Sequence, residues 1–259
     1  MTQEISVQLY AVREELDADL DGTLGKLADI GLRNVEGFNF VPRAAELRAG
    51  FARYGLSVPT AHGPFLSTEL KFGDQVIPVP PPEKTFEAAA ELGTDTVIDP
   101  YVAPDRWQSV DDIHRTADAL NKAADVAAGF GLRVGYHNHA HELEFSSGGK
   151  FGFEIFADRL DPRVVLEVDT YWSTVGGANT PELLRSLGSR VAALHIKDGP
   201  LGDDPFDQTP AGQGAVDIAA ILAAAPANAY AVIEFDQYAG DIFEGIKESY
   251  RYLSQKGLK

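Results

Sequence analysis

The stretch VVLEVDTY at 164–171 shows the pattern that decides the fold: a short apolar run with carboxylates near its end. Runs of the same kind, rich in Val, Ile, Leu or Tyr, recur at 5–10, 34–38, 57–62, 96–101, 133–139, 191–197 and 230–236. Their starts extend from 5 to 230 and are on average about 32 residues apart, the length of a unit of one strand and one helix. The runs therefore predict eight strands separated by helices.

Apolar residues at helical spacing occupy most of the segments between these runs. One continuous stripe with a period of 3.6 residues consists of Leu16, Leu20, Leu24, Leu27 and Gly31. Eight alternations of strand and helix, with no break in composition, predict a single α/β domain over residues 1–259, a (β/α)8 TIM barrel. An open sheet stays an alternative, because the number of strands does not by itself establish closure.

Composition excludes several classes of function. The 259 residues include 22 Lys and Arg against 39 Asp and Glu, a net charge of −17, which argues against nucleic acid or an anionic membrane as partner. The chain contains no Cys, which excludes disulfides, thiolate zinc sites and thiol nucleophiles. With neither a signal peptide nor a long apolar span in the sequence, we expect a cytoplasmic protein, and its oligomeric state stays open.

Two connections, at 63–83 and 198–216, are longer than the few residues usual between a strand and the next helix. Both follow predicted strands, so both lie at the carboxyl ends of the strands, where barrel enzymes place their active sites. Loops of this length at that end are candidates for lids over a site.

Ionisable residues follow four consecutive predicted strands in pairs, and residues two apart in a strand share a face. The pairs are His137 and His139, Glu167 and Asp169, His195 and Lys197, and Glu234 and Asp236. Buried carboxylates are costly unless they are paired or bind a cation, and a set of His, Asp and Glu without Cys suits Mn²⁺, Mg²⁺, Co²⁺ or Zn²⁺. Ordinary salt bridges across the barrel top are the alternative reading.

Short motifs accompany these strand ends, namely VEGF at 35–38, HGPF at 62–65, YHNHAHE at 136–142, LEVDTYW at 166–172, LHIKDG at 194–199, AGQG at 211–214 and VIEFD at 232–236. With them the chain resembles the sugar phosphate isomerase/epimerase family of xylose-isomerase-like TIM barrels. The resemblance implies one divalent metal ion, most often Mn²⁺, with ligands at Asp169, His195 and Glu234. We assign the remaining ligand to Glu142, with His137 as the fallback, because the sequence HNHAHE replaces the Glu that ketose 3-epimerases carry near the position of His137.

The chemistry of such a metal site and the resemblance together suggest the roles of further residues. We expect Glu234 to act as a base, His139 as its acid/base partner, and Lys197 to hold either an oxyanion or the carboxylate of Asp169. Contacts with the substrate are expected from His62, His137, Glu36 and Trp172.

The resulting hypothesis is an enzyme that isomerises or epimerises a small sugar or sugar derivative. It would remove the proton next to a carbonyl and pass through a metal-stabilised enediolate. The main alternative is a lyase, of the inosose dehydratase type or one acting on 3-keto-glycosides, in which the same enediolate expels a β-substituent. Apurinic-site endonucleases share this superfamily, but a net charge of −17 and six His argue against that activity. A barrel retained only for binding is the non-enzymatic alternative.

Overall fold

The computed structural model describes residues 3–72, 75–202 and 204–259, and within them the apolar runs form one eight-stranded sheet. Its strands are β1 (Ile5–Val7), β2 (Asn34–Gly37), β3 (Ser57–His62), β6 (Thr96–Asp99), β7 (Arg133–His137), β10 (Val165–Asp169), β11 (Val191–Ile196) and β12 (Tyr230–Ile233). Neighbouring strands pair in parallel in the order β1-β12-β11-β10-β7-β6-β3-β2.

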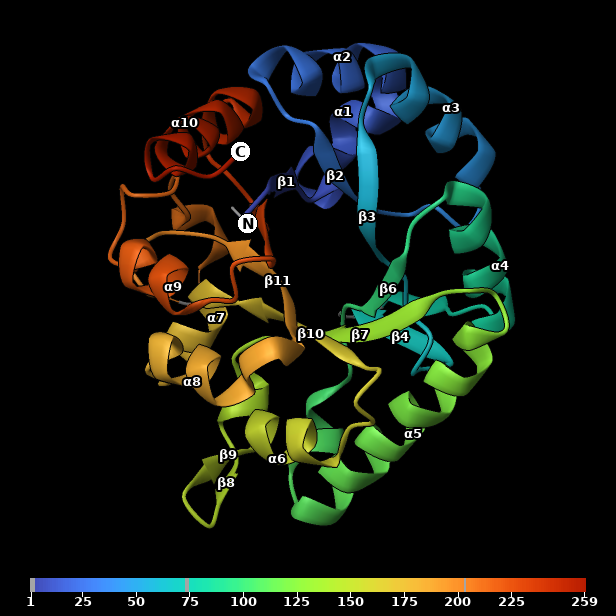
Figure 1. The fold of residues 1–259 in the computed structure, drawn as a ribbon, viewed down its shortest axis with the longest axis vertical. Coiled ribbons are helices and arrows are strands. Elements are labelled where there is room, and N and C mark those ends of the chain that lie inside the picture. The colour runs from blue at the N-terminus through green and yellow to red at the C-terminus, as the bar shows by residue number, and fades with distance from the viewer. Residues whose placement is uncertain (1–2, 73–74, 203) are drawn as a thin grey trace.

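The two end strands of this order, β1 and β2, meet through a parallel bridge between Gln8 and Glu36, which nearly closes the sheet. The predicted (β/α)8 barrel is therefore confirmed, and an open sheet is ruled out. Figure 1 shows the helices arranged as an outer layer around the strands. The apolar core fills the space between the two, with fully buried residues such as Leu24, Leu120 and Leu184 on the inner faces of the helices.

The outer layer consists of α1 (Arg13–Ala18), α2 (Leu20–Ile30), α3 (Ala44–Tyr54), α4 (Pro82–Leu92), α5 (Val110–Ala128), α6 (Gly152–Arg159), α7 (Thr170–Val175), α8 (Thr180–Leu187), α9 (Ile218–Ala224) and α10 (Ile242–Gln255). The continuous helix predicted from Leu16 to Gly31 is wrong in one respect, because Asp19 interrupts it. The backbone of Asp19 is not helical, and its side chain accepts a hydrogen bond from Gly22 N at 3.0 Å, which begins a new helix. Gly31 ends α2 with a φ of 116°, a conformation that favours glycine.

Several strands end earlier than predicted, and this matters for the site. β10 stops at Asp169 because the carboxylate of Asp169 accepts a hydrogen bond from Trp172 N at 2.8 Å and caps α7. β11 ends at Ile196 and β12 at Ile233, so Lys197 and Glu234 lie just beyond their strands. The polar residues thus sit where the barrel opens.

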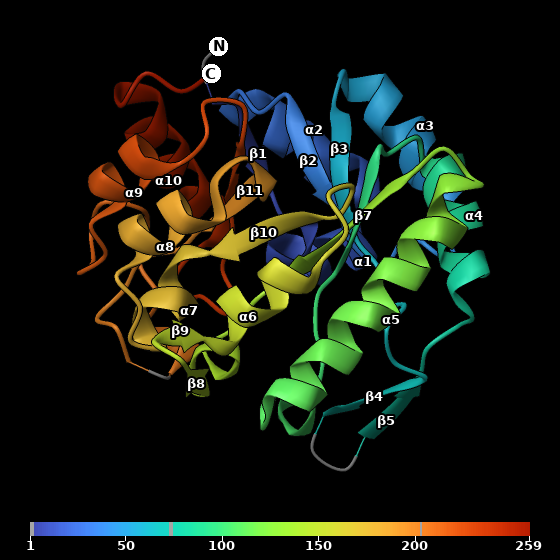
Figure 2. The ribbon, with the colours of Figure 1, turned by 60° about the horizontal axis from the view of Figure 1, so that its bottom comes forward.

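The two long connections have structure of their own. The first contains the hairpin of β4 (Glu69–Phe72) and β5 (Gln75–Pro78), which projects from the same end of the molecule as the small hairpin of β8 (Ser146–Ser147) and β9 (Lys150–Phe151) (Figure 2). In the second, the buried carboxylate of Asp198 accepts hydrogen bonds from Gly199 N, Gly212 N and Val216 N, which fold the segment onto itself. Among the described residues, we find no helix with the length and hydropathy needed to cross a membrane.

Candidate functional site

The pairing of the strands brings their inward-facing polar residues to one level of the barrel. His137 lies opposite Glu167 in the register of β7 and β10, and Asp169 lies opposite His195 in that of β10 and β11. Because partners in adjacent parallel strands face the same side of a sheet, these side chains converge inside the barrel. All four are at most 3% exposed.

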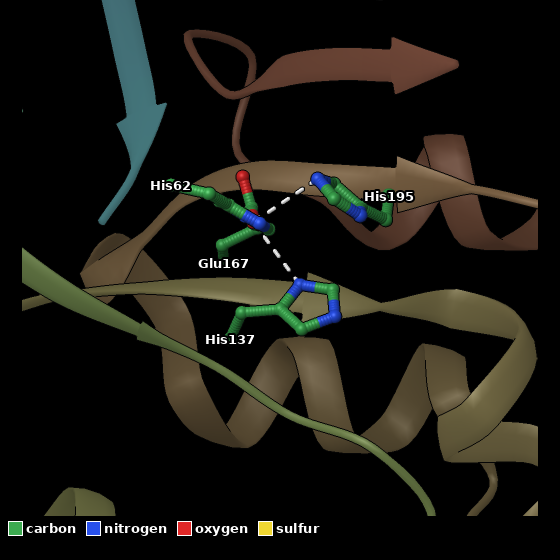
Figure 3. Close-up of side chains that lie close together, drawn as sticks. All are labelled: His62, His137, Glu167 and His195. Carbon is green, nitrogen blue, oxygen red and sulfur yellow. Dashed lines mark hydrogen bonds and ion pairs between the residues drawn. The ribbon is translucent and has the colours of Figure 1, made fainter. Parts of the chain in front are cut away.

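The deeper part of the site is organised around Glu167 (Figure 3). Its Oε2 atom lies 2.5 Å from His62 Nε2, 3.0 Å from His137 Nδ1 and 3.1 Å from His195 Nε2. Glu36 lies beside it and places Oε1 2.6 Å from His195 Nε2. We call Glu36 and Glu167 the deep carboxylates; both are fully buried.

A second set of groups, nearer the opening, has the composition of a metal site. We call His137, Asp169, His195 and Glu234 the mouth group; each can offer one ligand atom, and these atoms all lie within 4.8 Å of one another. Ligands on opposite sides of one ion, each about 2.1 Å from it, are separated by roughly 4 Å, so this spacing fits a single divalent cation. Imidazole and carboxylate donors without thiolate suit Mn²⁺, Co²⁺ or Zn²⁺.

Lys197 connects the mouth group to the rim. Its Nζ lies 2.8 Å from Asp169 Oδ2, 2.8 Å from Glu234 Oε2 and 2.8 Å from Asp236 Oδ1. Burial would lower the pKa of Lys197, but the carboxylates of Asp169, Asp236 and Glu234 outweigh it and hold that pKa well above its usual value. The side chain is therefore a buried ammonium ion, in contact with Asp169 as one of the two expected arrangements requires.

The charges of the mouth group depend on one another. Burial raises the pKa of Asp169 to about 6, against the opposing effect of the Lys197 ammonium. Burial also favours the neutral form of Glu234, but His195 and Lys197 hold the pKa of this carboxyl well below its usual range. The pKa of His195 is raised well above normal because Glu167, Glu234 and Glu36 outweigh its burial. A divalent cation would replace the positive charge that protonated His195 supplies.

The structure places Glu142, the expected first metal ligand, away from the mouth group. Its Oε1 accepts a hydrogen bond from Tyr136 Oη at 2.7 Å, and its Oε2 accepts one from His139 N at 2.8 Å. The ligand atoms with which it groups belong to His139 and His141. The reason is local: Glu142 lies on the short 3₁₀ helix η3 (His141–Leu143), past the end of β7, where the chain has already turned outward. The fallback, His137, takes the position in the mouth group.

His139 occupies the rim close to Lys197. Burial and the charge of Lys197 lower the pKa of His139 to about 3, so the imidazole is neutral. Its Nδ1 is buried and has no hydrogen-bond partner among the described residues. A pKa this low makes the imidazole a weak base, and the acid/base role of His139 stays a prediction.

The expected substrate contacts fall into two groups. Trp172 lies at the rim, half-buried, and its Nε1 donates a hydrogen bond to Asp236 Oδ2 at 3.0 Å. His62 and His137 lie deeper, against Glu167. Glu36, the fourth expected contact, is 0% exposed and belongs to β2 itself rather than to the loop that follows.

Two residues of the site were given no role from the sequence. The first is Glu167, which the sequence predicts only to lie at a strand end. Its position two residues before Asp169 in β10 is the signal that both side chains point into the barrel. Gln8 was missed altogether; the signal was a polar residue within the otherwise apolar run ISVQLY. Its Nε2 donates to Glu36 Oε1 at 2.6 Å.

Comparison with known proteins agrees with this architecture. The chain is 24% identical over 205 residues to an inosose dehydratase from Geobacillus kaustophilus, covering 69% of this chain and 61% of that protein. The chain spans about six tenths of the length of the curated relatives it matches. Its fold is similar to a sugar phosphate isomerase/epimerase from Parabacteroides distasonis, with a TM-score of 0.75, 23% identity and 98% of both chains covered.

The fold is equally similar to that of the IolI protein solved with a bound zinc atom, with a TM-score of 0.75, 16% identity, and 98% of this chain and 97% of that one covered. At such identities, these two likenesses concern the fold. A family model described as xylose isomerase-like TIM barrel matches residues 24–256, which extends from the second helix to the C-terminal one. The chain therefore belongs to the xylose isomerase-like TIM barrel family.

Proposed function

We propose that the protein is a divalent-metal-dependent isomerase or epimerase that acts on a sugar or sugar derivative by removing the proton next to a carbonyl. The observation that carries this proposal is the convergence of His137, Asp169, His195 and Glu234 at the barrel mouth, with the ammonium of Lys197 against two of them. The similarity to an isomerase/epimerase and to an inosose dehydratase supports the same class of chemistry.

The mouth group would hold the metal ion. When bound there, a divalent cation supplies a Lewis acid that stabilises the negative charge of an enediolate. Mn²⁺ is our first choice because half of the donors are carboxylates, and Zn²⁺ is the natural competitor because the other half are imidazoles.

The protein side chains would move the proton. Glu234 is ionised and would accept the proton from carbon, and His139 would act as its acid/base partner. Return of the proton to the opposite face of the same carbon gives an epimer, and its return to the neighbouring carbon shifts the carbonyl. The ammonium of Lys197 can donate a hydrogen bond to a developing oxyanion or hold Asp169 in place.

A lyase is the second candidate, and the position of His139 favours it. Once this imidazole has accepted a proton, it can pass that proton to a leaving oxygen at the β-carbon. The same first step then ends in elimination of water or of an alcohol, and the substrate gains a carbon–carbon double bond. The inosose dehydratase relative is consistent with this outcome.

Solvent deuterium uptake distinguishes the two. We would incubate the Mn²⁺-loaded protein in D₂O with ketoses, inososes and 3-keto-glycosides and follow the products by NMR. A deuterated epimer or isomer supports the proposal, whereas an unsaturated product or a released alcohol establishes the lyase. Asp169→Asn should abolish either reaction, and Asp125→Asn, which changes an exposed ion pair on α5, should not. A protein that retains no divalent ion and exchanges no proton would contradict both.

A further inference from the structure

The imidazole of His195 is held between carboxylates at both of its nitrogens. On the side of the mouth, Nδ1 lies 2.5 Å from Glu234 Oε2. On the inner side, Nε2 lies 2.6 Å from Glu36 Oε1. His195 and Glu36 are both fully buried, so water does not compete for these hydrogen bonds.

Glu36 is itself held in place from the first strand. Its Oε1 also accepts a hydrogen bond from Gln8 Nε2 at 2.6 Å, and Gln8 Oε1 in turn accepts one from Tyr10 N at 3.1 Å. Gln8 and Glu36 are the residues that form the bridge between β1 and β2. One continuous chain of hydrogen bonds therefore runs from Gln8, where the barrel closes, through Glu36 to His195.

We propose that Gln8 and Glu36 are positioning residues that keep the Nε2 proton of His195 and so leave Nδ1 facing the mouth group as the ligand atom for a divalent ion. A carboxylate on the outer nitrogen of a metal-binding histidine fixes its tautomer and orientation and makes the other nitrogen more basic. This inference rests on the proposed metal site and extends it to residues that do not touch the ion.

Glu167 is the competing candidate for holding the Nε2 proton of His195, and the distances argue against it. Its Oε2 is 3.1 Å from His195 Nε2, but it lies closer to His62 Nε2 at 2.5 Å and to His137 Nδ1 at 3.0 Å. Glu36 Oε1 also lies 3.2 Å from His62 Nε2, but it gives His195 its shortest contact at Nε2, whereas the shortest contact of Glu167 is with His62. Contact of Glu36 with a substrate would require an exposure that this side chain lacks.

Calorimetric titration of the full, metal-free chain with Mn²⁺ tests the proposal without measuring activity. We expect Glu36→Gln to weaken Mn²⁺ binding by about 10–100-fold, the usual range for such outer partners. Gln8→Leu, which keeps the carboxyl group of Glu36 but removes its hydrogen bond from Gln8 Nε2, should weaken binding by a smaller factor. Asp99→Asn is the matched control, because it changes another fully buried carboxyl to an amide at a residue that accepts hydrogen bonds from Phe65 N and Leu66 N, outside the mouth group, and it should leave the affinity unchanged.

A second readout separates positioning from general damage to the fold. In the Zn²⁺-loaded protein, ¹H–¹⁵N NMR spectra should show His195 with a slowly exchanging proton on Nε2, and this proton should exchange faster or be lost in Glu36→Gln. If Glu36→Gln does not fold, the smaller change in Gln8→Leu provides the same comparison.

The inference is overturned if Glu36→Gln binds Mn²⁺ as tightly as the unaltered protein, if Asp99→Asn loses as much affinity, or if Glu167→Gln alone weakens binding. Failure of the unaltered protein to bind any divalent ion would overturn the inference together with the metal dependence of the proposed function. Weaker binding in Glu36→Gln combined with a lack of deuterium uptake by the unaltered protein would contradict the proposed function only.

Discussion

Replacing Lys197 by Met tests the electrostatics of the mouth most directly. The Nζ atom makes 2.8 Å contacts with Asp169, Glu234 and Asp236, and the side chain is 1% exposed. Methionine keeps the unbranched shape and removes the charge, so buried carboxylates lose their cation. Removing one partner of a buried ion pair costs about 3–5 kcal/mol. For a chain of this size, each kcal/mol corresponds to roughly 2–4 °C in Tm, so we expect the metal-free Tm to fall by about 6–20 °C.

Divalent metal should reverse part of this loss. A cation in the mouth group would restore positive charge beside Asp169 and Glu234. In the variant, this cation would no longer compete with the Lys197 ammonium for these two carboxylates. A ligand at 100 times its Kd stabilises the folded state by about 2.7 kcal/mol. Because the variant should bind more tightly, we expect the same concentration of Mn²⁺ to raise its Tm by more than it raises that of the unaltered protein.

The assay is thermal unfolding followed by circular dichroism, with EDTA and then with increasing Mn²⁺. Lys71→Met is the matched control, since Lys71 pairs with Glu69 at 3.0 Å but is 67% exposed, and such pairs contribute at most about 1 kcal/mol. The reasoning is refuted if Lys197→Met lowers Tm no more than Lys71→Met does, or if Mn²⁺ raises Tm equally in the variant and the unaltered protein.

Two further predictions concern residues that order the two long connections. In the first connection, Asp99 Oδ2 accepts hydrogen bonds from Phe65 N and Leu66 N at 2.7 Å each. Burial raises the pKa of Asp99 to about 6 from its usual value of 3.8, so its contribution to stability is present below about pH 4 and is lost as the pH rises through about 6. In urea unfolding, the free energy of unfolding of Asp99→Asn should therefore rise by about 3 kcal/mol relative to that of the unaltered protein between pH 4 and pH 7. A difference that stays constant with pH would contradict this. In the 198–216 segment, a Cβ added at Gly214 would lie 2.2 Å from Gly199 N, whereas one at Gly202 would meet no atom of the described chain within 4 Å. Gly214→Ala should thus destabilise the fold by about 1–3 kcal/mol and Gly202→Ala should change stability far less, as measured by the same unfolding assay.

Local sequence was sufficient for the features that depend on neighbouring residues. Alternation within a strand places Glu167 and Asp169 on one face, and it does the same for His195 and the residue two positions later. The apolar run before each pair identifies a strand that ends at the barrel opening. For this reason the sequence alone predicts that Asp169, His195 and Glu234 lie together, and the structure groups them within 4.8 Å.

Other local expectations failed where a single side chain redirects the backbone. Asp19 breaks an apolar stripe of the correct period, because its carboxylate caps the following helix instead of continuing the preceding one. Glu142 is close in sequence to His137, but the chain leaves the strand between them and turns into a short 3₁₀ helix. Beyond the end of a strand, a spacing of a few residues does not determine where a side chain points.

Only the tertiary structure decided which nitrogen meets which carboxylate. The contact between His195 and Glu36 joins residues 159 positions apart, and it depends on the strand register around the barrel and on the bridge that joins β1 to β2. Sequence patterns specify the face of each strand, because that is set by the geometry of one chain segment. The distances across the barrel arise from how all the strands are staggered against one another, which is a property of the closed sheet and not of any single segment.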